Sequence, residues 1–300
     1  MTKIKMFSLS LVAFAIISCG GDTTETNTKT VGKNSNVAPG LESNTSSESS
    51  AAKDNIFRLN FSDPPTFDPA LVTDTTSASI IVEIFSGLVT LNKELDIIPD
   101  LAESWDISDD GRIYTFNLRD DIKFSNGDKV TASDFKWSIE RAANPDTGSM
   151  NAEVYLGDIV GVTEVIEAGG SLTEVSGLKV IDDKTLEITI DEPKTYFLAK
   201  LTYPTAFVLS EKYVTQQGED WIDQPVGTGP FVMTEYQIGQ TLKLKPNDNY
   251  WGEKAKVDGI IMNLAGGVSM AMYENDEVDI TGVGLADLER VKDPNDPLNK

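Results

Sequence analysis

Histidine is missing from this 300-residue sequence, and cysteine occurs only once. The lack of histidine excludes Ser-His-Asp and Cys-His catalytic arrangements and removes a common zinc ligand and general base. The 48 Asp and Glu residues could include an acid/base pair of the kind that hydrolyses glycosidic bonds. No spacing singles out such a pair, and no Gly-x-Ser-x-Gly elbow, phosphate-binding loop or metal motif occurs. The sequence therefore predicts no catalytic residue, no metal site and no cofactor.

The setting of the single cysteine, Cys19, indicates lipidation. Residues 6–17 are an apolar run behind a short positive region, too short to span a bilayer but typical of a secretory signal peptide. Cys19 follows this run between Ser18 and Gly20, as in a bacterial lipobox. We expect residues 1–19 to be a lipoprotein signal peptide, with Cys19 diacylated and anchoring an exported protein to the cell-envelope membrane. The alternative is an ordinary signal peptide with an incidental cysteine.

The formal net charge of −23 bears on possible partners. A nucleic acid would be repelled, because its phosphates carry the same sign of charge. The acidity favours solubility and weak non-specific adhesion. It does not identify a ligand.

The composition of residues 20–54 predicts a flexible tether. They are mainly Ser, Thr, Asn, Gly, Glu and Lys, with no aromatic residue and few apolar ones. Such a segment cannot bury enough apolar surface to offset the entropy of ordering it. A coil of this length would span roughly 30 Å root-mean-square, enough to hold a folded domain clear of the membrane.

The folded part is predicted to begin near Ile56. Apolar and polar residues alternate over 56–62, which is the period of a half-buried strand. A turn-rich segment at 63–69 leads to a helix for which Thr76 or Ser77 is the expected N-cap. The apolar residues expected on one face of this helix are Ile80, Ile81, Ile84, Phe85 and Leu88.

Residues 90–220 indicate mixed β and α structure. Alternation predicts strands at 113–118 and 186–190, and Asn126-Gly127 predicts a hairpin with a type I′ turn. Thr131 is the expected N-cap of a helix that buries Phe135, Ile139 and Ala142. The aromatic residues expected in the core are Trp105, Tyr114, Phe116 and Trp137.

Two glycines and two prolines lie close together over 225–231. This composition fixes a sharp backbone path, and we expect Gly227 and Gly229 to enable a tight turn there. Strand-like Leu242 and Leu244 follow.

Three groups of segments, taken together, resemble the large solute-binding proteins of peptide and nickel importers, extracellular solute-binding family 5. The first is Thr66-Phe67-Asp68-Pro69 with the helix after it. The second runs from 101 to 141 and includes Ala102-Glu103-Ser104-Trp105, Phe124-Ser125-Asn126-Gly127 and Thr131-Ala132-Ser133-Asp134-Phe135. The third is Gly227-Thr228-Gly229-Pro230-Phe231, followed by Asn249-Tyr250-Trp251 and Glu277-Val278-Asp279-Ile280. Their order over about residues 56–285 makes the resemblance specific.

The resemblance implies an α/β fold of the class II periplasmic-binding-protein type, the large peptide-binding form with two lobes. Lobe I would take residues 55–89 and 222–300, with an inserted α/β subdomain at 90–221. Relatives of this family are nearly twice as long, so the second lobe is absent from this sequence. We therefore expect residues 20–300 alone to bind no peptide at micromolar concentration.

The function implied is that of a substrate-binding lipoprotein that captures peptides and delivers them to the permease and ATPase subunits of an ABC importer. Within the family, a nickel chelate or an oligosaccharide is an alternative ligand. The lack of histidine, and of cysteine beyond Cys19, argues against nickel. Outside the family, the alternatives are a surface adhesin and a glycosidase.

The resemblance also suggests ligand-binding residues. In relatives, the loop matching Thr73-Asp74-Thr75-Thr76 lines the cleft, and its backbone can pair with an extended peptide; the alternative is a solvated loop. Asn151 occupies a place where some relatives have a cleft tyrosine, and nearby Tyr155 could substitute for it. Gly282 and Val283 stand where relatives often have a cleft aromatic residue.

Overall fold

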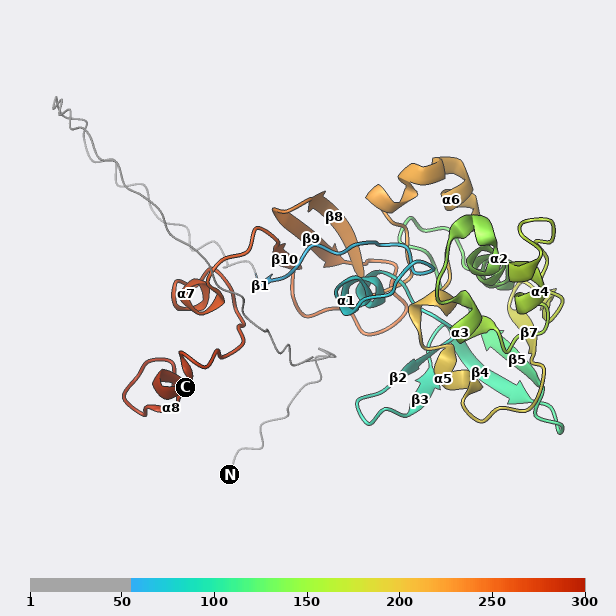
Figure 1. Cartoon of the computed structure of the whole chain (residues 1–300), viewed down its shortest axis with the longest axis horizontal. Coiled ribbons are helices and arrows are strands. Elements are labelled where there is room, and N and C mark those ends of the chain that lie inside the picture. The colour runs from blue at the N-terminus through green and yellow to red at the C-terminus, as the bar shows by residue number, and fades with distance from the viewer. Residues whose placement is uncertain (1–54, 300) are drawn as a thin grey trace. The chain divides into compact units, whose positions relative to one another are not determined.

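Two four-stranded sheets organise residues 55–299, the part of the chain that the computed structural model describes (Figure 1). The predicted signal peptide, the lipidation of Cys19 and the tether at 20–54 lie outside the described residues. None of the helices within 55–299 has both the length and the apolar character needed to cross a bilayer.

The first sheet has the strand order β1-β10-β9-β8. It combines β1 (Ile56–Asn60) with β8 (Phe231–Gln237), β9 (Thr241–Pro246) and β10 (Gly259–Asn263). β1 runs parallel to β10, whereas the other neighbours are antiparallel. The strands predicted near residues 56 and 242 are confirmed. β1 thus pairs with a strand that lies some 200 residues later in the sequence.

Helix α1 (Thr75–Ile84) packs against β8 and buries Ile80, Ile81 and Ile84. The predicted helix is confirmed, but its predicted cap is wrong. Asp74 is the N-cap, and its carboxylate accepts a hydrogen bond from the Ser77 N–H at 2.8 Å. The helix also ends at Ile84, so the buried residues Phe85 and Leu88 lie beyond it.

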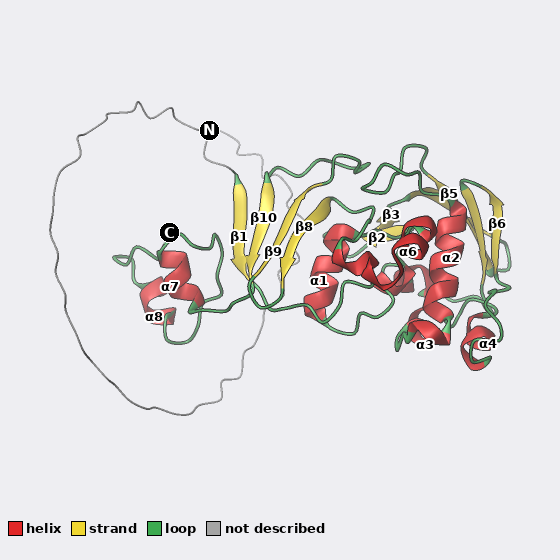
Figure 2. Ribbon diagram, turned by 90° about the horizontal axis from the view of Figure 1, so that it is seen from above, coloured by secondary structure: helices red, strands yellow, loops and turns green. Residues whose placement is uncertain are grey.

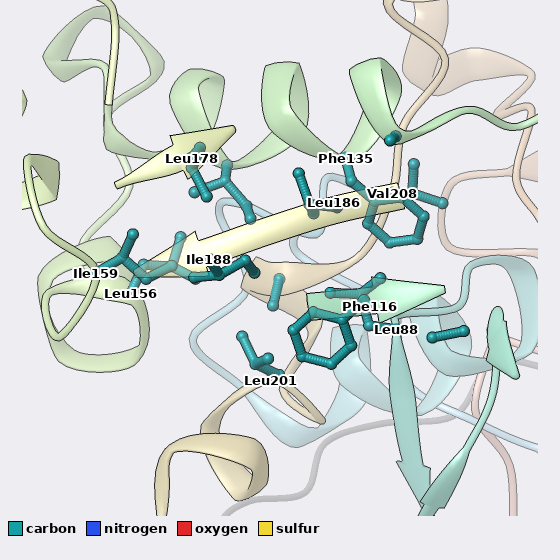
Figure 3. Close-up of a cluster of buried hydrophobic side chains, with 14 of the residues drawn as sticks. Leu88, Phe116, Phe135, Leu156, Ile159, Leu178, Leu186, Ile188, Leu201 and Val208 are labelled. Carbon is teal, nitrogen blue, oxygen red and sulfur yellow. The ribbon is translucent and has the colours of Figure 1, made fainter. Parts of the chain in front are cut away.

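The second sheet has the strand order β4-β5-β7-β6, with every neighbouring pair antiparallel. Its strands are β4 (Ala102–Ile107), β5 (Ile113–Leu118), β6 (Leu178–Asp182) and β7 (Thr185–Thr189). Helix α2 (Ala132–Ala143) packs against β6 and β7. Figure 3 shows Phe135 of α2 on the same side as Leu186 and Ile188 of β7, as the 3.6- and 2-residue periods predict.

The other elements are short and connect or flank these two sheets (Figure 2). They are β2 (Val89–Leu91) and β3 (Ile97–Pro99), which form a hairpin, α3 (Ala152–Leu156), α4 (Val162–Glu167), α5 (Phe197–Lys200), α6 (Glu211–Gln217), α7 (Ser269–Glu274), α8 (Leu288–Lys292), and the 3-10 helices Pro145–Thr147, Pro204–Ala206 and Gly218–Asp223.

The predicted aromatic core is present in its main members. Tyr114 and Phe116 are buried, and Trp105 and Trp137 are partly buried against the two apolar clusters. One cluster packs the second sheet against its helices, and the other lies between α1 and the first sheet. Both clusters include residues from each side of the predicted boundaries at 89 and 222, and the split into lobe I and an inserted subdomain stays a prediction.

The hairpin at Asn126-Gly127 exists, but its predicted turn type is wrong. The Gly127 N–H donates to the Phe124 carbonyl at 2.8 Å, and the Phe124 N–H donates to the Asp128 carbonyl at 2.9 Å. Gly127 has a φ of +90°, whereas Asn126 is not among the residues with positive φ. A type I′ turn needs positive φ at both central residues, so this is a three-residue loop with only Gly127 left-handed.

Residues 84–87, 125–127, 227–230 and 247–251 meet in one place, which we call the junction. The Ser125 N–H donates to the Gly227 carbonyl, and the Gly229 N–H donates to the Ile84 carbonyl, each at 2.8 Å. The Asn249 side chain closes the set by donating to the Ser125 carbonyl at 3.1 Å. The junction thus connects the end of α1 to both halves of the chain.

Gly227 and Gly229 are needed in the junction for a reason other than the predicted tight turn. Neither has a positive φ. A Cβ at Gly227 would collide with the carbonyl oxygen of Ile84, and one at Gly229 would lie 2.6 Å from that of Glu83. Glycine permits this close backbone approach.

Candidate functional site

The end of the loop before α1 and the first two residues of that helix, Thr73–Thr76, present main-chain N–H groups that the rest of the described chain does not use. Thr73 and Thr75 are exposed, and Asp74 and Thr76 are partly exposed. Among residues 55–299, no acceptor meets the main-chain N–H groups of Thr73, Asp74, Thr75 or Thr76. The first N–H groups of a helix have no partner within it, so they are available to a ligand.

Side chains near α3 donate hydrogen bonds to the backbone just before this loop. The Asn151 Nδ2 donates to the Val72 carbonyl at 2.7 Å, and the Ser149 Oγ donates to the Ala70 carbonyl at 2.5 Å. Ser149 and Asn151 are two residues apart in the sequence, and so are the residues whose carbonyls they bind, Ala70 and Val72. Asn151 is therefore brought to the predicted loop, but its amide is engaged with the protein's own backbone.

Tyr155 also lies here, stacked on a tyrosine that the sequence did not single out. The rings of Tyr155 and Tyr203 are 3.6 Å apart and inclined by 4°. The Tyr203 hydroxyl lies 3.3 Å from the Asn151 Nδ2 and 3.4 Å from the Val72 carbonyl. Nothing in the sequence marks Tyr203 among the eight tyrosines, because its contacts come from residues far away along the chain.

A buried ion pair supports the same stretch. Asp68, from the Thr66–Pro69 motif, receives two hydrogen bonds from the Arg141 guanidinium, at 3.1 and 2.6 Å. Its side chain is 4% exposed and that of Arg141 is 18% exposed. Asp68 Oδ1 also accepts from the Ala70 N–H at 2.9 Å. The backbone from Asp68 to Val72 is thus fixed at each second residue.

Gly282 and Val283 are not joined to this group. Both are exposed, and a Cβ at Gly282 would meet nothing within 4 Å. They follow Ile280, which forms a parallel bridge with Leu59 at the edge of the first sheet. Within residues 55–299 no hydrogen bond or ring contact connects them to Thr73–Thr76. Their role in ligand binding stays a prediction.

A surface cavity of about 460 Å³ beside α2 is a weaker candidate. Its lining includes Lys136, Glu140, Arg141 and Glu174. Lys136 pairs with both glutamates, and Arg141 is engaged with Asp68. The charged side chains that line the cavity are therefore already paired, either with one another or with Asp68.

Two carboxyl groups near the junction have strongly shifted acidity. Burial raises the pKa of Glu83 to about 7. Burial also raises the pKa of Asp100 to about 6, against the opposing effects of the Trp251 side chain and the Arg119 guanidinium. Desolvation accounts for both shifts because it disfavours the charged form of an acid. Shifted carboxyls can mark a catalytic site, but structural networks produce them as well.

Within the described residues, no group of three or more His, Cys, Asp or Glu side chains is placed to hold a metal ion. The best-defined site is therefore the loop at Thr73–Thr76 with its supporting residues Asn151, Tyr155 and Tyr203. This loop on a two-sheet α/β scaffold is the candidate ligand-binding site.

Residues 96–299 match the family model of the bacterial extracellular solute-binding proteins, family 5 (middle part). The chain belongs to this family, as its motifs predicted.

Two curated relatives are from Escherichia coli strain K12. The chain is 32% identical over 238 residues to the periplasmic oligopeptide-binding protein OppA, which covers 77% of this chain and 43% of OppA. It is equally identical over 238 residues to the probable deoxycholate-binding periplasmic protein YgiS, covering 77% of this chain and 44% of YgiS. The chain thus spans less than half the length of these relatives.

The solved structure of Listeria monocytogenes OppA bound to peptide matches with a TM-score of 0.75 and 30% identity. The match covers 82% of this chain and 50% of that one. The predicted class of fold, the large peptide-binding type of periplasmic binding protein, is confirmed.

Proposed function

We propose that this chain carries one side of the ligand site of an ABC importer's solute-binding protein, and that the ligand is a peptide. The observation that carries the proposal is the run of main-chain N–H groups at Thr73–Thr76 that have no partner among residues 55–299. Hydrogen bonds to main-chain groups bind an extended peptide without demanding particular side chains. Delivery to a permease, and anchoring through a lipid on Cys19, belong to the same proposal.

The support behind the loop strengthens the case. Asn151, Tyr203 and the Asp68–Arg141 pair hold the backbone up to Val72. A loop that is already ordered loses little conformational entropy when it binds, and this saving improves affinity. We assign Asn151 to this support and no catalytic role to Glu83 or Asp100, because burial is the main cause of both pKa shifts.

The test removes one main-chain donor while keeping the fold. Thr75 is the first helical residue of α1, and Asp74 before it has extended backbone angles, φ −132° and ψ 158°. Proline suits this position because the lost N–H has no partner in the helix. The protein made from its complete reading frame should bind peptide, measured by calorimetry, and Thr75→Pro should weaken binding about tenfold, the effect of one lost hydrogen bond.

Thr75→Ala is the matched control, because it removes the side chain and keeps the N–H. We expect it to stay within about twofold of the wild type, given that only a solvated hydroxyl is lost. Equal affinities for the proline and alanine variants would show that the ligand does not use this donor.

The name of one relative favours a second candidate ligand. YgiS is named as a probable deoxycholate-binding protein, and deoxycholate carries a carboxylate. Unpaired N–H groups at the start of a helix also suit an anion. Competition decides between the two: peptide amides without a free carboxylate should displace a labelled peptide if the main chain is recognised, whereas displacement by deoxycholate alone would favour the bile-acid reading.

A further inference from the structure

Asp74 is the one charged side chain in the candidate site, which comprises Thr73–Thr76, Asn151, Tyr155 and Tyr203. Its Oδ1 caps α1 through the Ser77 N–H. Its Oδ2 accepts no hydrogen bond and joins no ion pair with any of residues 55–299. The carboxylate is partly exposed, so one of its oxygens is free to meet a ligand.

The stacked tyrosines contact the backbone two residues before this carboxylate. The Tyr203 hydroxyl reaches the carbonyl of Val72, two residues before Asp74. Burial raises the pKa of Tyr203, and the nearby Tyr155 and the negative charge of Asp74 add to the rise. The carboxylate and the phenol are therefore electrostatic neighbours, although they come from segments about 130 residues apart in the sequence.

A carboxylate beside aromatic rings is suited to one class of ligand group. The faces and hydroxyls of Tyr side chains carry partial negative charge, which attracts Lys ammonium and Arg guanidinium groups. A carboxylate adds a charge-assisted hydrogen bond to the same cation. The formal net charge of −23 acts in the same direction, because it draws cationic molecules toward the protein.

We propose that Asp74, together with the Tyr155–Tyr203 stack, selects peptides that carry a Lys or Arg side chain. This inference rests on the proposed function: the N–H groups at Thr73–Thr76 hold the peptide main chain, and the cationic side chain lies against the tyrosines and Asp74. Tyr203 is then a specificity-determining residue that the sequence did not suggest.

The test compares lysine with norleucine, its uncharged near-isostere, at each position of a five-residue alanine peptide. Affinities are measured by calorimetry on the protein from its complete reading frame. At one position the lysine peptide should bind about tenfold more tightly than the norleucine peptide, the combined effect of a cation–π contact and a partly exposed ion pair. Asp74→Asn should reduce this ratio to about twofold. Asparagine caps a helix as well as aspartate does, so the variant keeps its fold.

Asp109→Asn is the matched control. Asp109 is an exposed carboxylate in the turn between β4 and β5, so this variant changes the net charge equally without touching the site. An equal fall in the lysine ratio for both variants would attribute selection to overall charge and overturn the assignment to Asp74. Tyr203→Leu should also lower the lysine ratio; an unchanged ratio there would remove the tyrosine stack from the proposal.

The outcomes separate this inference from the function on which it rests. Wild-type protein that binds the lysine and norleucine peptides equally well at every position would overturn cation selection and leave peptide binding in place. Wild-type protein that binds none of the peptides would overturn both.

Discussion

The junction and the candidate site share the helix α1 but lie at opposite ends of it. At the C-terminal end, the junction is formed by backbone groups that hydrogen-bond one another, with glycines where no Cβ fits. At the N-terminal end, the loop at Thr73–Thr76 is exposed or partly exposed, and its N–H groups have no partner among residues 55–299. One end is closed by its own hydrogen bonds, whereas the N–H groups at the other end remain available among the described residues.

This difference explains why the sequence motifs of the chain identify its fold rather than its ligand. Ser125–Gly127, Gly227–Pro230 and Asn249–Trp251 identify the family, and all three meet in the junction. They describe how the scaffold is held together. At the other end of α1 the Thr66–Pro69 motif supplies Asp68, which supports the backbone rather than facing a ligand, so membership in the family says less about the ligand than about the fold.

The largest expected effect concerns the ion pair beneath the site. Arg141→Leu leaves the Asp68 carboxylate buried without its partner, which typically costs about 3–5 kcal/mol. Chemical denaturation of both proteins measures the difference. Lys212→Met is the control, because the exposed Lys212–Asp128 pair, at 3.0 Å, should contribute under about 1 kcal/mol. Similar losses for the two variants would mean that the site lacks the rigid support inferred for it.

The next effect tests the junction through pH. Glu83 has a pKa of about 7 in the folded chain against 4.5 for the free side chain. Between these values the unfolded chain loses this proton first, so folding stability falls as the pH rises from about 4.5 to about 7. The full shift corresponds to about 3 kcal/mol.

Glu83→Gln removes this titration. The variant should be more stable than the wild type by up to about 3 kcal/mol at pH 8 and nearly equal to it at pH 4. Thermal unfolding across this range measures the difference between the two proteins. A constant difference at all pH values would show that Glu83 ionises freely and that the C-terminal end of α1 is open to solvent.

The regular elements were predictable from the sequence because their signals are local. The alternation over β5 and the apolar stripe of α2 depend only on near neighbours, and both predictions are confirmed. Errors arose where adjacent residues compete for one role. Asp74, Thr76 and Ser77 can all cap a helix, and only the backbone path shows that Asp74 does so.

The site was predictable only in part. The loop at Thr73–Thr76 and Tyr155 came from family resemblance, and the structure places them close together through Asn151 and Tyr203. Tyr203 could not be found, since its partners Val72 and Asn151 are 131 and 52 residues away in the sequence. Contacts over such separations have no periodic signal in a single sequence.

The smallest predicted effect compares one glycine from each kind of region. Gly227→Ala places a methyl group against the Ile84 carbonyl, and the backbone must move to admit it. Overpacking of this kind typically costs about 1–3 kcal/mol. Gly282→Ala meets open space at a backbone angle that alanine tolerates, so its cost should be near zero, or a gain of a few tenths of a kcal/mol, about what a less flexible unfolded chain gives. Both variants carry the same chemical change, so their difference in thermal unfolding isolates the surroundings. A substantial loss for Gly282→Ala would mean that this segment is packed against another part of the protein, and its assignment to an open ligand-facing surface would then be wrong.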